Sequence, residues 1–196
     1  MSSHHFVKEG QEPALFITHA LSLELVQPLL EWAPLVVVLD SAVDEVLQWG
    51  IKIDVVMGAT DRIPALKEKL ADQHPVTIEA YLKDENPIEK GILFLADSGN
   101  TAVTIVIQNP ESRFQLAKDH RELQIIFLDN TLKWSMHVER FEKWVAAHTP
   151  VLIQVDKSDQ TLSYIGLTPD GNRFIASHDG LVRVTSNSIF WIGELP

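Results

Sequence analysis

Apolar positions in the first two thirds of the chain form short continuous runs that alternate with segments of helical spacing. The most regular stretch covers residues 35–63 and reads LVVVLDSAVDEVLQWGIKIDVVMGATDRI. Its runs at 35–39 and 53–57 are apolar on both faces, which is typical of strands buried in a parallel sheet. Helical spacing over 41–49 predicts a helix with Ser41 as its N-cap and Gly50 just past its end. The stretch therefore predicts a strand–helix–strand unit whose two strands are parallel.

The same alternation continues on both sides of this unit. Further apolar runs predict strands at 14–18, 76–82, 102–107 and 123–128. Helical spacing predicts helices at 21–32, 63–71, 84–97 and 111–120. Either Asp84 or Asn86 suits the N-cap of the third of these helices, and Pro87 suits its first turn. Regular alternation of strands and helices predicts a parallel, doubly wound α/β domain over residues 1–131.

The pattern changes after about residue 132, where short apolar runs are separated by turn sequences such as PDGN. These runs predict strands at 151–155, 161–167, 173–176, 181–185 and 189–192. Their spacing is typical of antiparallel hairpins, so we expect a small antiparallel β domain over residues 132–196. The segment 136–147 fits a helix, or a strand followed by a turn, and the residues leave both open.

Composition narrows the possible partners. The net charge of −11 in 196 residues disfavours a nucleic acid or an anionic membrane as partner. A nucleotide is compatible with this charge, because bound Mg²⁺ can lie between acidic side chains and phosphates. The absence of cysteine excludes disulfides and thiolate chemistry, and no apolar run reaches the length of a membrane span. We therefore expect a cytoplasmic protein, with its five tryptophans as core or interface anchors.

Three carboxylates, those of Asp40, Asp61 and Asp84, each follow a predicted strand closely. The carboxyl ends of parallel strands share one edge of a sheet, and ligands bind at that edge in open α/β sheets. Carboxylate oxygens are ligands that Mg²⁺ prefers. Acidic residues are also common caps and turn formers, and the residues alone favour that interpretation.

At these positions the chain resembles the thiamin pyrophosphokinases. Their pattern D-G-G-A-N, a helix, and G-x-x-P-D-x-x-x-G-D-F-D-S-I corresponds in spacing to Asp40-Ser41-Ala42-Val43-Asp44, Gly50, Asp54 and Gly58-Ala59-Thr60-Asp61-Arg62-Ile63. Their D-x-T-D-x-x-K pattern is similar to residues 84–90, and their G-G-R-x-D-H pattern to residues 111–116. Residues 181–192 resemble the last strands of the family, with Ser186-Asn187 similar to its S-N pair. The resemblance covers most of the chain in layout.

The resemblance implies a homodimer that transfers a pyrophosphoryl group from ATP to thiamin with Mg²⁺, giving thiamin diphosphate and AMP. On the catalytic and metal side it implies Asp40, Asp61 and Asp84, with Asp61 and Asp84 as metal ligands. On the nucleotide side it implies Lys90, Arg113 and Arg62. On the thiamin side it implies Ser186, Asn187 and Trp191. The β domain is then expected to form the dimer and to help build the thiamin pocket.

Several positions depart from the family pattern. Ala59, Pro87 and Gln115 replace carboxylates, and Leu116 replaces a histidine. Arg62 stands in place of a serine and supplies a positive charge where the family resemblance implies a cation. These changes predict impaired or altered activity, because single electrostatic contacts in a site are often worth about 10²–10³-fold in rate. The alternatives are a related enzyme with another acceptor alcohol, or an inactive binding module that senses a nucleotide, a thiamin compound or another phosphorylated ligand.

Overall fold

The computed structural model describes residues 13–155 and 161–196. The chain divides into two compact units, Met1–Asn130 and Thr131–Pro196. Across the described ranges, no helix is long and apolar enough to cross a membrane.

In residues 13–130, six parallel strands form a sheet in the order β6-β5-β1-β2-β3-β4. The strands are β1 (Ala14–Ile17), β2 (Val36–Leu39), β3 (Val55–Ala59), β4 (Thr77–Tyr81), β5 (Ala102–Val106) and β6 (Gln124–Leu128). Strands β1 to β4 lie side by side in the order of the sequence, and β5 and β6 lie on the other side of β1. This order confirms the predicted doubly wound parallel sheet.

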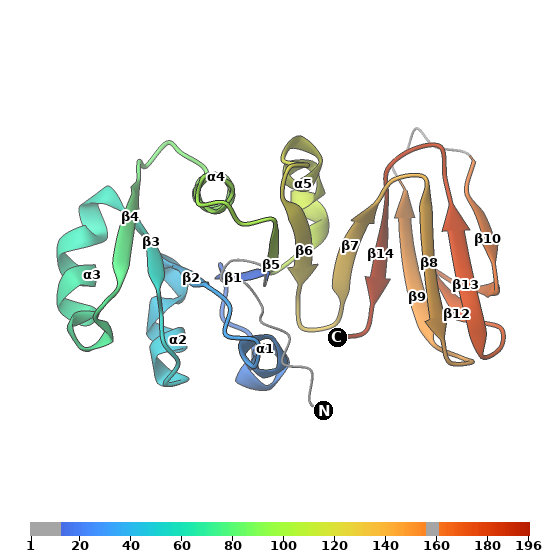
Figure 1. Cartoon of the computed structure of the whole chain (residues 1–196), viewed down its shortest axis with the longest axis horizontal. Helices are drawn as coiled ribbons and strands as arrows, with labels where there is room; N and C mark the ends of the chain where they lie inside the picture. The colour runs from blue at the N-terminus through green and yellow to red at the C-terminus, as the bar shows by residue number, and fades with distance from the viewer. Residues whose placement is uncertain (1–12, 156–160) are drawn as a thin grey trace, which may run out of the picture. The chain divides into compact units, whose positions relative to one another are not determined.

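Helices cover both faces of this sheet, and Figure 1 shows α1 and α2 on one side with α4 and α5 on the other. The helices are α1 (Leu23–Leu30), α2 (Val43–Gln48), α3 (Ile63–Lys69), α4 (Pro87–Asp97) and α5 (Phe114–Asp119). Short 3-10 turns follow the strands or helices at η1 (Asp40–Ala42), η2 (Thr60–Arg62), η3 (Ala71–Gln73) and η4 (Pro110–Arg113).

Strand β1 shows why its residues are apolar on both faces. Leu15 and Ile17 belong to one buried cluster with Val26 of α1 and Val46 of α2. Phe16, between them in sequence, points the opposite way, and its ring would lie 2.4 Å from a Cβ placed on Gly91 of α4. Glycine at this position lets α4 approach the sheet closely, so β1 is buried from both sides.

The helix that follows β2 begins differently from the prediction. The chain tightens into η1 directly after the strand, so Ala42 rather than Ser41 occupies the N-cap position of α2, without a side-chain cap bond. Ser41 lies inside the turn and is exposed. Asn86 rather than Asp84 is the N-cap of α4. Its side-chain oxygen accepts hydrogen bonds from the backbone N–H groups of Ile88 and Glu89 at 3.1 and 3.5 Å.

The second unit is built from antiparallel strands in two sheets, ordered β11-β12-β9-β14-β7 and β10-β13-β8 within this unit. The strands are β7 (Lys133–His137), β8 (Arg140–Val145), β9 (Pro150–Val155), β10 (Ser163–Ile165), β11 (Leu167–Asp170), β12 (Arg173–Ala176), β13 (Gly180–Thr185) and β14 (Phe190–Glu194). A buried cluster joins the sheets, with Phe141 and Val182 from one and Val151 and Phe190 from the other. The predicted antiparallel β domain is thus confirmed as two packed sheets.

Two local predictions change in this unit. Residues 161–167 form no single strand, because Gly166 adopts φ +76° and separates β10 from β11, which pair in different sheets. The segment 136–147 is extended, so the strand interpretation holds and the helical one is wrong. Glu139, with φ 64°, separates β7 from β8.

The cap of α4 gives a direct test of these helix starts. We expect Asn86→Ala to lower the free energy of unfolding by about 1 kcal/mol, because two backbone N–H groups lose their acceptor. Ser41→Ala is the matched control and should change it by less than about 0.5 kcal/mol, since Ser41 caps nothing. Urea denaturation monitored by tryptophan fluorescence measures both values. Equal losses in the two variants would contradict the assignment.

Candidate functional site

The carboxyl ends of β2, β3 and β4 bring together residues that are far apart in sequence. Leu39 of β2 pairs with Met57 of β3, and Ala59 of β3 pairs with Tyr81 of β4. Asp40 therefore leaves β2 beside the end of β3, with the end of β4 one strand further along. The strand register places a buried carboxylate, the η2 turn and a phenol at one edge.

Asp40 is the centre of this arrangement and is only 4% exposed. Its Oδ1 accepts a hydrogen bond from the Tyr81 hydroxyl at 3.1 Å. Its Oδ2 accepts from the backbone N–H of Ala59 at 3.1 Å and lies 3.3 Å from Arg62 Nη1. The carboxylate thus has partners on both oxygens and one positive charge beside it.

Tyr81 is held in its neutral form by this environment. Burial raises the pKa of its hydroxyl to about 12, and the charge of Asp40 and the hydrogen bond to it add to this rise. Asp61 also raises the pKa of Tyr81, whereas Arg62 lowers it. The Thr60 hydroxyl donates to the Tyr81 carbonyl at 2.9 Å, which ties η2 to β4. Tyr81 therefore remains a donor to Asp40 at neutral pH.

The other two predicted carboxylates have a different environment. Asp61 in η2 and Asp84 in the loop between β4 and α4 are both exposed, and neither makes a hydrogen bond or ion pair with a described residue. Among residues 13–155 and 161–196, no group of three or more His, Cys, Asp or Glu side chains is arranged to hold a metal ion.

The three carboxylates differ in how well they could bind Mg²⁺. Asp40 does not fit as a metal ligand, because both of its oxygens are engaged and Arg62 lies beside them. Asp61 and Asp84 keep their oxygens available, and Mg²⁺ often takes only one or two carboxylates when phosphates supply further ligands. The residues thus fit an ion shared with a phosphate ligand better than one held by protein alone.

Lys90 lies in α4 and is already paired. Its Nζ is 3.3 Å from Glu85 Oε1, while Glu85 Oε2 accepts from the Leu82 backbone N–H at 2.6 Å. The Leu82 hydrogen bond, with the nearby Lys90, lowers the pKa of Glu85. Lys90 and Glu85 therefore fix the loop that carries Asp84.

A second feature of the same edge lies between the neighbouring strands β1 and β5. From β1 the chain continues to β2 on one side, whereas from β5 it continues to β6 on the other, so the two connections lead away from each other. His19 follows β1 and Gln108 follows β5, and their Nε2 atoms lie 2.6 Å apart. Arg113 ends η4, further along the connection after β5, and is half-buried. In open α/β sheets the crevice at this divergence is a common ligand site.

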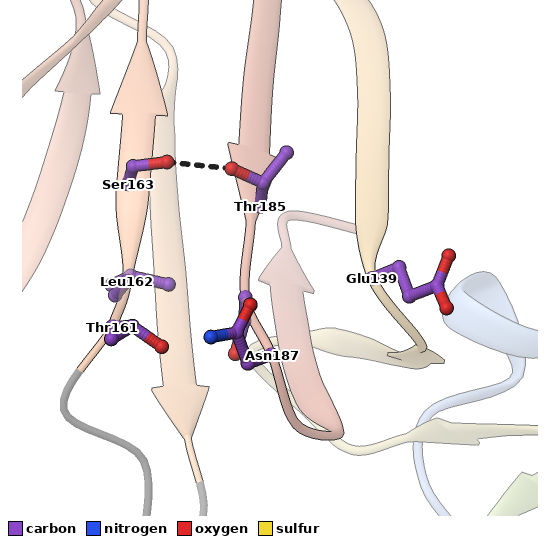
Figure 2. A pocket seen from close by; sticks show the side chains of 7 residues that line it. Glu139, Thr161, Leu162, Ser163, Thr185 and Asn187 are labelled. Carbon is purple, nitrogen blue, oxygen red and sulfur yellow. Dashed lines mark hydrogen bonds between the residues drawn. The ribbon is translucent and has the colours of Figure 1, made fainter.

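The second unit contains an open pocket of about 620 Å³, shown in Figure 2. Its lining consists of Glu139, Thr161, Leu162, Ser163, Thr185, Ser186 and Asn187. The hydroxyls of Ser163 and Thr185 are hydrogen-bonded at 2.6 Å across β10 and β13. The described lining is therefore rich in hydroxyl and amide groups, with one carboxylate and no lysine or arginine.

The structure brings two of the three predicted thiamin residues into this pocket. Asn187 is exposed, and Ser186 is buried with its backbone N–H donating to the Glu139 carbonyl at 3.1 Å. Trp191 does not line the pocket. It lies within β14, is 3% exposed, and pairs with Met136 and Gln154 on the neighbouring strands.

Sequence reasoning missed Tyr81 and Glu139. Tyr81 ends an alternating run, so its place at the carboxyl end of a strand was a usable signal. No sequence signal pointed to Glu139, because only the left-handed backbone between β7 and β8 places it beside the 185–187 segment.

Comparisons with known proteins come from structure alone: no family model matches the sequence, and no curated protein matches it. The thiamine pyrophosphokinase from Bacillus subtilis is similar with a TM-score of 0.70 at 12% identity, over 93% of this chain and 98% of that one. The thiamin pyrophosphokinase from Candida albicans has a TM-score of 0.69 at 12% identity, over 95% and 90% of the two chains. Yeast thiamin pyrophosphokinase has a TM-score of 0.69 at 9% identity, over 98% and 88%.

Sequence identities this low support a shared fold but not a shared substrate or activity. The likeness covers both units and spans almost the whole of each compared chain. The resemblance seen in the sequence is confirmed at this level: the chain has the fold of the thiamin pyrophosphokinases.

Proposed function

We propose that the protein transfers a pyrophosphoryl group from ATP to thiamin, with an activity altered by its substituted site. The observation that carries the proposal is the fold, shared over 93% of this chain with the Bacillus subtilis enzyme. The acidic edge of β2–β4 and the polar pocket of the second unit support it. In the reaction, the thiamin hydroxyl oxygen bonds to the β-phosphorus of ATP, the bond from that phosphorus to the α–β bridging oxygen breaks, AMP leaves, and the hydroxyl proton passes to solvent.

On the nucleotide side we assign Asp61 and Asp84 to the metal and Arg113 to the phosphates, while Lys90 has a positioning role. Mg²⁺ entering with ATP would neutralise phosphate charge, with ligands from the phosphates and these two exposed carboxylates. Lys90 orients the Asp84 loop through Glu85, and Arg113 follows the divergence of β1 and β5. These residues bind and position the nucleotide.

Asp40 supports the site through its neighbours. Buried and paired on both oxygens, it holds Arg62, the Ala59 backbone and Tyr81 in one arrangement. Because Tyr81 stays neutral, its hydroxyl remains a hydrogen-bond donor to Asp40 through the neutral range. Asp40 and Arg62 then act by fixing η2, which carries Asp61, against β4.

On the thiamin side we assign the pocket that contains Ser186 and Asn187. The thiazolium ring of thiamin is permanently cationic, and a pocket with no lysine or arginine in its described lining suits a cation. Glu139 contributes its backbone carbonyl, which accepts from the Ser186 N–H, while its carboxylate points away from the other lining side chains in Figure 2. Hydroxyl and amide groups of the lining suit the polar substituents of the ligand. Trp191 is not assigned to this pocket, because Phe190 and Ile192 pack into the cluster between the two sheets, so the intervening Trp191 faces the other side of β14.

We also propose that the second unit forms a homodimer. Trp144, Leu181 and Ile165 are 64%, 51% and 60% exposed. Leu181 pairs directly with Trp144, and Ile165 pairs with Arg183 two residues from Leu181, so all three lie on one face of the β10-β13-β8 sheet. Large apolar side chains gathered on one exposed face are typical of an interaction surface.

Turnover tests the central proposal. Purified protein with ATP, Mg²⁺ and thiamin should form thiamin diphosphate and AMP in equal amounts, measured by chromatography. Asp61→Asn should lower the rate by about 10²–10³-fold, because one charge facing the metal and phosphates is lost. Asp72→Asn is the control, since Asp72 is exposed in η3 before β4, at the other end of the strands. Wild-type protein that forms neither product would overturn the proposal.

The Tyr81 hydroxyl predicts a pH dependence of stability. Between pH 10.0 and about 12, Tyr81 is deprotonated in the unfolded chain but protonated in the folded one. The unfolded state then binds fewer protons, so stability falls as pH rises through this range. We expect the stability advantage of wild type over Tyr81→Phe to be greatest below pH 10.0 and to shrink above it. Urea denaturation at a series of pH values measures this, and a constant difference would contradict it.

The apolar face predicts the oligomeric state. Wild-type protein should have the mass of a dimer by size-exclusion chromatography with light scattering. Trp144→Glu and Leu181→Glu should each give monomers, because a charge would be buried without a partner. Lys67→Glu, an exposed change on α3, should leave the dimer intact. A monomeric wild type would refute the proposed dimer without bearing on turnover.

A further inference from the structure

The ion pair between Arg62 and Asp40 has a consequence that the transfer reaction does not require. We propose that Arg62 is a built-in counter-cation that excludes divalent metal ions from Asp40, and that a neutral residue at position 62 turns this edge into a divalent-cation site. The proposal stands apart from the proposed function, because it concerns metal binding without ATP or thiamin.

The first argument is charge. A carboxylate only 4% exposed needs a compensating positive charge, because a buried ion without one is strongly destabilising. The Tyr81 hydroxyl and the Ala59 N–H donate hydrogen bonds but carry no net charge. Arg62 supplies the charge, with Nη1 3.3 Å from Oδ2. Among the described residues, no other ion pair reaches Asp40.

The second argument is space. Mg²⁺ and Mn²⁺ bind carboxylate oxygens at about 2.0–2.2 Å. At Asp40, Oδ1 is covered by the Tyr81 hydroxyl and Oδ2 by the Ala59 N–H and the guanidinium. A metal ion would have to displace Arg62 and also bear its repulsion. The guanidinium therefore blocks the ion both by position and by charge.

The third argument is what would remain without Arg62. Asp40 would lose the charged partner that the described residues supply, while exposed Asp61, next to Arg62 in η2, would keep its available oxygens. Asp61 directly precedes Arg62 in η2, and the Arg62 guanidinium reaches Asp40, so the two carboxylates belong to the same edge of the sheet. Two carboxylates and water are a typical ligand set for a divalent ion.

The test measures Mn²⁺ binding without nucleotide, by the electron paramagnetic resonance signal of free Mn²⁺. Arg62→Ser and Arg62→Gln should bind Mn²⁺ about tenfold more tightly than wild type, since removing one half-exposed positive charge beside the carboxylate is worth about that much. Arg62→Lys keeps the charge and should resemble wild type. Arg121→Ser is the matched control, because Arg121 is an exposed arginine of the same unit whose Nε donates to the Lys118 carbonyl. It should also resemble wild type.

A double variant locates the new site. Adding Asp40→Asn to Arg62→Gln should abolish the gained Mn²⁺ affinity, whereas binding elsewhere would persist. The melting temperature is a second readout: Arg62→Gln should melt below wild type without metal and regain stability with Mn²⁺, and wild type should show no such gain.

Three results would overturn the proposal. One is wild-type binding as tight as that of Arg62→Gln. Another is no gain in either neutral variant. The third is an equal gain in Arg62→Lys. If both neutral variants fail to fold, wild type and Asp40→Asn still decide: wild-type Mn²⁺ affinity that falls in Asp40→Asn would show that the guanidinium does not exclude the ion.

Discussion

A carboxylate withdrawn from water must be compensated by its neighbours, and at Asp40 this requirement joins three strands. The phenol comes from the end of β4, the backbone N–H from the end of β3 and the guanidinium from the turn after β3. Each partner can reach the carboxylate only if the strands are parallel, adjacent and in the observed register. The network therefore depends on the sheet, and it in turn fixes the η2 turn and its exposed Asp61.

The two units suit different ligand chemistry. The α/β unit ends its strands in acidic side chains, with Lys90 and Arg113 on the following connections, an arrangement that suits phosphates accompanied by a cation. The described lining of the pocket in the β unit offers hydroxyls and an amide and has no lysine or arginine, which suits a polar or cationic organic molecule. A transfer from a nucleotide to thiamin requires one site of each kind.

Close packing explains features that propensity alone would disfavour. Glycine is a poor helix former, yet Gly91 lies within α4 because the Phe16 ring leaves no room for a side chain there. Gly193 in β14 shows the same constraint, since an added Cβ would lie 2.9 Å from the Trp134 ring. Trp134 and Trp191 are buried anchors, as expected of tryptophans, whereas Trp32 and Trp144 are 66% and 64% exposed. The burial of an aromatic residue thus depends on the neighbouring strand or helix.

The sequence by itself determined the order of strands and helices, the parallel sheet and the change to antiparallel strands near residue 132, because hydrophobic periodicity is a local property. It also placed Asp40, Asp61 and Asp84 after strands. It missed the break at Gly166 and the true start of α2, which depend on backbone geometry, and it left the helix-or-strand choice at 136–147 open. Only the tertiary structure decided that Asp40 is buried and paired with Arg62 and Tyr81, and that Glu139 joins Ser186 and Asn187 in one pocket. These residues lie 22 to 48 positions apart in the sequence, and no local pattern records which side chains meet once strands are aligned.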